Sequence, residues 1–303
     1  MPVGRLGSLL HVRPGLALFL LLLPPALWFG TIYLGSLLTL VLQSFYSIDD
    51  YTGAIVREPT LATLRTLVSQ PAHLDIVLRT LAMALVVTVA SVLVAFPLAY
   101  YMARYARGRV RTLLYVAVIA PMWTSYLVKV YAWRLILAKE GILSWFVARL
   151  GLTGGLEALL ATPVVGGPSL ASSYLGMALV FLYMWLPFVI LPIEASLQRV
   201  PRGLLEASGD LGATPVQTFC HVVVPLAVPG IAAGSVFAFS LTLGDYVIPQ
   251  VVGAPGYFIG MMVYEQQGTA GNLPLAAAFS IVPMLLVGIY LMLAKRVGAF
   301  DAL

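Results

Sequence analysis

The polar residues best able to bind a partner or do chemistry gather in one stretch, EASGDLGATPVQTFCHVVVP, which runs from Glu206 to Pro225. It holds a glutamate, an aspartate, a glutamine and a histidine, although the chain is 61% hydrophobic and only 10% charged. The three histidines of the chain, His11, His73 and His221, are far apart and lack the spacing of metal ligands, so we expect no metal site. What the stretch is for depends on the elements that hold it.

The composition indicates an integral membrane protein. A soluble domain carries roughly 25% charged residues, because most of its surface meets water. A soluble chain of 303 residues could not bury so much apolar surface. The net charge of +5 does not indicate a nucleic-acid partner, because the basic residues are scattered at the ends of apolar segments. The single cysteine, Cys220, excludes an internal disulfide.

Apolar segments long enough to cross a bilayer predict an all-α membrane protein with six transmembrane helices. They are roughly Leu16–Leu42, Ile76–Ala103, Thr112–Leu137, Ser172–Leu197, Val228–Val251 and Ala276–Ala294. The first continues well beyond the length of a signal-peptide core and no clean cleavage site follows it, so we interpret it as a retained span. Prolines inside several of these segments predict kinks rather than ends, because neighbouring helices can satisfy the freed carbonyl groups.

Charge alternates between the connections and predicts the orientation in the membrane. With six spans, one side holds Arg5, Arg13, Arg104, Arg107, Arg109, Arg111, Arg199, Arg202, Lys295 and Arg296. The opposite side holds Asp49, Asp50, Glu58, Asp75, Glu140, Glu157 and Glu265 with fewer basic residues. Because cytoplasmic loops of membrane proteins are enriched in Lys and Arg, both termini and the segment 200–227 are expected in the cytoplasm.

Local signals inside the segment 200–227 predict two short helices joined by a glycine. Pro201 suits a first helical position, and Gly212 suits the C-terminal end of that helix. Thr214 suits an N-cap, with Pro215 first in the second helix and Gln217 completing a capping box. Such a pair cannot cross the membrane and projects from it. It is either a docking element for another protein or a solvated connection between spans.

The stretch resembles the EAA signature of bacterial ABC importer permeases. The signature has Glu-Ala-Ala, a Gly four residues later, nine further residues and then Ile-x-Leu-Pro. Here it reads Glu206-Ala207-Ser208, Gly212, nine residues, and Val222-Val223-Val224-Pro225, so that Ser208, Val222 and Val224 depart from it. In that family the loop forms a coupling helix that fits a groove on the ATP-hydrolysing subunit. The resemblance assigns this coupling role to Leu205, Glu206, Ala207, Ser208, Asp210, Leu211, Gly212 and Pro225.

A longer resemblance covers most of Ile76–Ala294 and points to the spermidine/putrescine permeases. It rests on PMWTSYLVKVYAW (Pro121–Trp133), RGLLEASGDLGA (Arg202–Ala213) and LGDYVIPQVVGAP (Leu243–Pro255). It implies a type I ABC importer permease that forms half of a path for a small solute, here a polyamine, in the bacterial inner membrane. It also implies three kinds of partner besides membrane lipids: a second, different permease subunit, two copies of an ABC ATPase, and a periplasmic solute-binding protein.

The resemblance also implies a division of the chain. Residues 1–75 would hold the N-terminal tail, the first span and a periplasmic loop, residues 76–295 the transmembrane domain, and residues 296–303 a cytoplasmic tail. The chain contains no G-x-x-x-x-G-K-[ST] sequence, which an ATPase needs to hold the terminal phosphates. We therefore expect the chain not to be an enzyme and to bind no cofactor, with Mg-ATP bound by the partner ATPase.

Polar and aromatic residues inside the spans are candidates for contact with the solute. An ionisable group in the bilayer is costly and tends to face a cavity or a partner. The candidates are Asp245, placed in the outer part of the fifth span, with Tyr246, Tyr183, Trp185 and Phe188. A carboxylate and aromatic faces suit an ammonium group. The alternatives are that the aromatic residues only pack, and that Asp245 pairs with a basic residue or caps a kink.

Three further ionisable residues near the span ends are expected outside the path. Lys129 and Arg134 would repel a polycation, so we place them toward headgroups or acidic partners. Glu194 lies near the cytoplasmic end of the fourth span and is expected to meet water or Arg199.

Other functions remain open. The same architecture could import iron, sulfate or an amino-acid-like compound. A membrane enzyme would need a Ser–His pair, paired aspartates or metal ligands at one depth, and no histidine lies inside a predicted span. A secondary carrier would not need the cytoplasmic helix pair.

Overall fold

A computed structural model of the chain describes residues 14–49, 51–163 and 165–296. The predictions that concern Arg5, His11, Arg13, Asp50 and the tail 297–303 lie outside these residues. The described part is almost entirely helical, apart from the short antiparallel strands β1 (Ser47–Ile48) and β2 (Ile55–Val56). Before α10 the helical elements are α2 (Pro14–Leu27), η1 (Trp28–Leu34), α3 (Gly35–Gln43), α4 (Ala62–Ser69), α5 (Pro71–Arg104), α6 (Gly108–Trp123), α7 (Tyr126–Ile136), α8 (Ile142–Arg149), α9 (Thr153–Leu160) and η2 (Leu170–Ser172).

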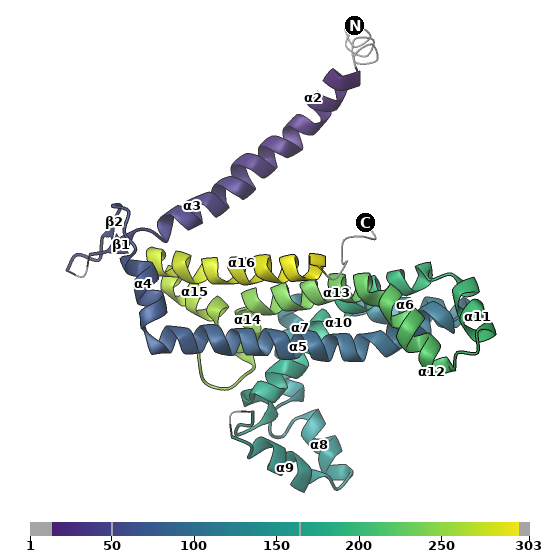
Figure 1. The fold of residues 1–303 in the computed structure, drawn as a ribbon. Helices are drawn as coiled ribbons and strands as arrows, with labels where there is room; N and C mark the ends of the chain where they lie inside the picture. The colour runs from purple at the N-terminus through teal and green to yellow at the C-terminus, as the bar shows by residue number, and fades with distance from the viewer. Residues whose placement is uncertain (1–13, 50, 164, 297–303) are drawn as a thin grey trace, which may run out of the picture.

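The second half of the chain supplies the centre of the bundle. Its elements are α10 (Tyr174–Arg199), α11 (Arg202–Asp210), α12 (Pro215–Thr218), η3 (Phe219–Val223), α13 (Val224–Gly244), α14 (Val247–Val251), α15 (Ile259–Gly268) and α16 (Leu273–Arg296). In Figure 1, α5, α13 and α16 run side by side, with α11 and α12 at one end and β1, β2 and α4 at the other. We call these the inner end and the outer end, because the charge pattern assigns the first to the cytoplasm.

The core forms where α10 packs against α5 and α13. Buried apolar residues of α10 recur every three or four positions, as a helix with one core-facing stripe requires. On α13, Gly230 and Gly234 lie against α10 so closely that an added Cβ would be 2.5 Å from the Pro192 carbonyl oxygen and 3.0 Å from the Val189 Cα. Small residues of this kind let two membrane helices approach at backbone distance.

The number of spans agrees with the prediction if one broken helix is counted as a span. Within the described residues, five helices are long and apolar enough to cross a membrane, or six if the bent pair α6–α7 is taken as one. The prolines at positions 97, 187 and 192 lie inside continuous helices, as predicted. The first span stands away from the bundle in Figure 1, and α3 at its end contacts α16.

Two predicted spans differ from the structure. The third, Thr112–Leu137, is broken between α6 and α7 by a 99° bend, because Thr124 is extended and Ser125 is not helical. The fifth was predicted as Val228–Val251, but its helix begins at Pro215 and ends at Gly244. The second short helix of the segment 200–227 is therefore continuous with the fifth span, joined to it by the π-helical turn η3. Pro225 and Pro229 lie within this helix rather than before it.

Candidate functional site

The segment 200–227, here called the coupling loop, forms a helical corner at the inner end (Figure 1). Its first helix, α11, begins one residue later than predicted, with Pro201 at the N-cap. The corner turns at Gly212, whose φ of +80° is readily adopted only by glycine. The predicted capping box is present: Thr214 Oγ1 accepts from the Gln217 N–H, and Gln217 Oε1 accepts from the Thr214 N–H. Both helices therefore have defined ends, which makes the corner rigid.

The tip of the coupling loop exposes apolar side chains. Leu211 is 89% exposed and Val216 is 71% exposed. Between the two helices lies a hollow of about 380 Å³, lined by Ser208, Leu211, Gly212, Ala213, Gln217 and His221. An exposed apolar tip with a hollow beside it is typical of a docking surface.

The residues predicted for coupling do not all lie at this tip. Glu206, Ala207, Asp210, Leu211 and Gly212 are exposed. Ser208 is half-buried and its hydroxyl lies 2.9 Å from that of Thr218, which braces α11 against α12. Leu205 packs toward the core, and Pro225 lies in the first turn of α13, so these two support the loop from behind.

Contacts to α5 hold the coupling loop on the bundle. The Phe219 ring packs edge-on against Phe96 and Tyr100, with centroids 5.8 Å and 5.6 Å apart. Arg104, the last residue of α5, donates to the Val200 carbonyl oxygen at 3.0 Å, at the point where α10 ends. The loop therefore cannot shift without moving α5 and α10.

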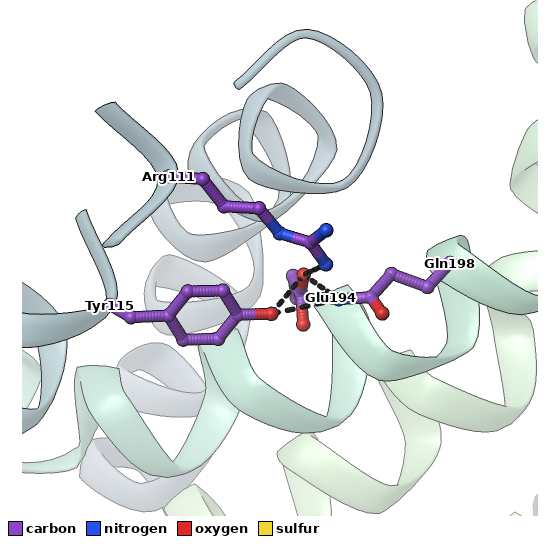
Figure 2. Close-up of polar contacts among 4 residues, drawn as sticks. All are labelled: Arg111, Tyr115, Glu194 and Gln198. Carbon is purple, nitrogen blue, oxygen red and sulfur yellow. Dashed lines mark hydrogen bonds and ion pairs between the residues drawn. The ribbon is translucent and has the colours of Figure 1, made fainter. Parts of the chain in front are cut away.

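A buried acid ties α6 to α10 just before the coupling loop (Figure 2). Tyr115 donates from its hydroxyl to Glu194 Oε1 at 2.5 Å, and Gln198 Nε2 donates both to that hydroxyl, at 2.7 Å, and to Glu194. Arg111 Nη2 lies 3.6 Å from the same carboxylate. The prediction that Glu194 meets water was wrong, because its side chain is only 4% exposed.

The roles of Tyr115 and Gln198 were missed by the sequence analysis. The only signal was spacing: Arg111 precedes Tyr115 by four residues, and Glu194 precedes Gln198 by four, so each pair shares a helix face. Which faces of two different helices meet is not encoded in that spacing.

At the outer end, a break in the chain positions Asp245. The helix α13 ends at Gly244, so Asp245 lies in the break before α14 and not in the fifth span, as was predicted. Its Oδ1 accepts from the Ile248 N–H at 2.9 Å, which caps α14, and its Oδ2 accepts from the Tyr126 hydroxyl. The predicted alternative that Asp245 caps a kink is therefore correct for one of its oxygens.

A mainly apolar pocket with a few polar groups opens beside Asp245. It has a volume of about 330 Å³, and its lining includes Tyr126, Trp185, Ser240, Asp245 and Tyr246. The rings of Tyr126 and Trp185 lie nearly parallel with centroids 6.3 Å apart. The Trp185 Nε1 and the Ser240 Oγ are both buried without a hydrogen-bond partner among the described residues. Buried polar groups are nearly always satisfied, so unpaired ones in a pocket wall mark a place for a ligand, water or partner.

The structure brings together three of the five residues predicted to contact the solute, namely Asp245, Tyr246 and Trp185, and adds Tyr126 and Ser240. Phe188 lies behind the pocket against Trp185, with ring centroids 6.2 Å apart. Tyr183 instead packs against Trp133 at 5.2 Å. For Tyr183 the alternative prediction, that it only packs, fits the structure better.

Lys129, which was predicted to face headgroups or acidic partners, is half-buried and makes a contact that the sequence did not indicate. Its Nζ donates to the Pro121 carbonyl oxygen at 2.9 Å, across the break between α6 and α7. The break frees carbonyl groups in the last turn of α6, and the ammonium group satisfies one of them. Arg134 is exposed.

Comparisons with known proteins agree on one group. The family model described as "Binding-protein-dependent transport system inner membrane component" matches residues 95–298. The chain is 58% identical over 301 residues to the inner membrane ABC transporter permease protein YdcU of Escherichia coli (strain K12), which covers 99% of this chain and 96% of that protein. It is 28% identical over 275 residues to the spermidine/putrescine transport system permease protein PotB of the same organism, over 90% of each chain.

A solved structure has the same fold. The chain aligns with a bacterial ABC transporter involved in the import of the acidic polysaccharide alginate, with a TM-score of 0.66 and 17% sequence identity. The alignment covers 96% of this chain and 99% of that one.

Proposed function

The chain belongs to the binding-protein-dependent transport system inner membrane components, and we propose that the solute it carries is an organic cation of the polyamine type. Membership makes it the permease subunit of an ABC importer, a multi-pass inner-membrane protein without a catalytic role of its own. The type I permease family indicated by the EAA-like stretch is thereby confirmed. The polyamine assignment is the finer step and needs its own support.

The pocket beside Asp245 is the observation that carries the polyamine proposal. It combines a carboxylate with the rings of Tyr126, Trp185 and Tyr246. A negative charge surrounded by aromatic rings favours an ammonium group, through charge pairing and through cation–π attraction. A sulfate ion would be repelled by the same carboxylate. The likeness to PotB, whose name specifies spermidine and putrescine, supports the same solute class.

The proposed assembly follows the family. A second, different permease subunit completes the path, two copies of an ABC ATPase bind Mg-ATP below it, and a periplasmic protein delivers the solute. The coupling loop contacts one ATPase subunit through its exposed tip at Leu211 and Val216, and both termini face the cytoplasm. The exposure of this tip supports the docking role, because water alone would not favour two apolar side chains there.

Uptake measurements test the solute class. In cells whose other polyamine importers are deleted, expression of the complete transporter should restore uptake of radiolabelled putrescine and spermidine. Asp245→Asn should lower the initial rate at least tenfold, because a charge-assisted contact is worth about 1.5–3 kcal/mol. Asparagine keeps an oxygen that can cap α14, so the break itself should survive. Glu140→Gln, which alters an exposed acid outside the pocket, is the matched control.

Uptake of sulfate, iron or an amino acid by the wild-type transporter, with no uptake of polyamines, would contradict the proposed solute.

A further inference from the structure

A second pocket, lined by tyrosines and one acid, lies at the outer end next to the Asp245 pocket. It has a volume of about 250 Å³, and its lining includes Tyr246, Gln250, Tyr257, Tyr264 and Glu265. Three segments build it: the start of α14, the loop 252–258 and the helix α15. None of the described residues that line it is basic. From the sequence, Glu265 was predicted only to be an acidic residue on the outer side.

The side chains of this pocket are arranged around the carboxylate. Tyr246 and Tyr264 stack with ring centroids 4.9 Å apart and an interplanar angle of 8°. Glu265 lies beside the Tyr257 hydroxyl and raises the pKa of that hydroxyl, by hydrogen bonding and by its negative charge. Glu265 therefore lies within reach of the Tyr257 hydroxyl and supplies the carboxylate of the pocket. A carboxylate beside stacked aromatic rings attracts an ammonium group.

The two pockets are neighbours. Tyr246 lines both of them. The helix α15 lies directly on the break at Asp245, since an added Cβ on Gly260 would be 2.6 Å from the Asp245 carbonyl oxygen. Glu265 lies on the same helix, five residues after Gly260. The carboxylates of Asp245 and Glu265 therefore belong to neighbouring pockets that share the Tyr246 side chain.

We propose that Glu265, with Tyr246, Tyr257 and Tyr264, forms an outer ammonium site, and that this site and the Asp245 pocket bind the two amino groups of one diamine or polyamine. The proposal rests on the proposed function, and it deepens that function by assigning the two amino groups of one polyamine to two separate carboxylates. A monoamine can occupy only one of the two sites, so it gains nothing from the second carboxylate.

Equilibrium binding to the purified complete transporter, with the periplasmic protein omitted, tests the two-site arrangement. The probes are radiolabelled putrescine, a diamine, and butylamine, a monoamine of the same chain length. Glu265→Gln should weaken putrescine binding about tenfold and leave butylamine binding unchanged. Tyr264→Phe should bind putrescine like the wild type, because it keeps the aromatic face, whereas Tyr264→Leu should bind it severalfold more weakly. Glu157→Gln, an exposed acid on α9, should have no effect.

Each other outcome counts against the outer site. Unchanged putrescine binding in Glu265→Gln, or an equal loss for both probes, would overturn it while leaving polyamine transport intact. A wild-type transporter that takes up putrescine in cells but does not bind it when purified would also overturn it. If the wild type neither binds nor takes up polyamines, the proposed function fails as well.

Discussion

Glu194 places a carboxylate in a buried position, where a charged group costs free energy. It lies near the inner end of α10 with its side chain 4% exposed. Burial of a carboxylate is tolerated only when hydrogen bonds and an opposite charge replace the lost water. Tyr115 and Gln198 supply the hydrogen bonds, and Arg111, 42% exposed, supplies the charge from the water side (Figure 2). The cluster therefore stabilises the contact between α6 and α10 only while all its members are present.

Replacement of Glu194 tests this dependence. Glu194→Leu leaves the Tyr115 hydroxyl without its acceptor and removes one of the two acceptors of the Gln198 amide, which should cost about 1–3 kcal/mol of stability. Glu194→Gln keeps an acceptor oxygen and should cost clearly less. The measurement is the midpoint of thermal unfolding of the purified transporter in detergent, together with the rate of uptake. Glu157→Leu, at an exposed site, should shift the midpoint little. Equal midpoints for the leucine and glutamine variants of Glu194 would contradict this account.

Among the elements, α10 and α13 make the closest contact, through glycines. Gly230 and Gly234 are four residues apart and face α10 together. The space between α13 and α10 leaves no room for a methyl group at Gly230, because an added Cβ would lie 2.5 Å from the backbone oxygen of Pro192. Backbone atoms cannot rotate away as a side chain does, so the two helices would have to separate.

Two glycine-to-alanine variants compare this contact with an open site. Gly230→Ala should destabilise the protein by about 1–3 kcal/mol through overpacking. Gly288→Ala in α16, where no atom lies within 4 Å of the added Cβ, should be neutral or stabilise by up to about 1 kcal/mol, because alanine favours the helix. Thermal unfolding in the same detergent compares them. If both variants melt alike, the α10–α13 contact is looser than described.

The elements were predictable to the extent that hydropathy and capping determine them. The second and fourth spans, which contain Pro97, Pro187 and Pro192, could be predicted from their continuous apolar sequence. The N-cap at Thr214 could be predicted from the residues next to it. The bend between α6 and α7 was missed because the residues on both sides of it are apolar, and only the surrounding fold stabilises the non-helical backbone at Thr124 and Ser125. The early start of the fifth helix at Pro215 was missed because Pro225 and Pro229 resemble breaks when read without tertiary contacts.

At the scale of the whole molecule, the two candidate regions lie apart. The coupling loop occupies the inner end, whereas α14, which follows Asp245, lies nearer the middle of the bundle and α15, which carries Glu265, lies closer to α4 (Figure 1). The sequence predicted the local structure of the coupling loop, namely the turn at Gly212 and the capping box at Thr214, because these follow from neighbouring residues. It predicted only part of the Asp245 pocket, since Tyr126 comes from a helix 119 residues earlier in the chain. No local pattern joins residues at that distance.

The docking role of the coupling loop predicts a charge-sensitive partner. Glu206→Arg reverses the charge of an exposed residue on α11 without touching the core. We expect it to reduce copurification of the ABC ATPase subunit at least tenfold and to abolish uptake, because a reversed charge on a docking helix turns attraction into repulsion. Glu140→Arg, an equally exposed reversal away from the loop, should copurify the ATPase normally. A Glu206→Arg transporter that retains both ATPase and uptake would show that the loop docks elsewhere.

The unbroken helix from Pro215 to Gly244 has a mechanical consequence. Its 30 residues make a rod about 45 Å long, with the proposed ATPase contact at one tip and Asp245 just past the other. A swing of about 10° at the inner tip would displace the far tip by roughly 8 Å, by simple trigonometry on that length. Such a displacement is larger than the length of a hydrogen bond, so a modest pivot at the cytoplasmic face is enough to separate the carboxylate of Asp245 from Tyr126 and to open the proposed solute pocket.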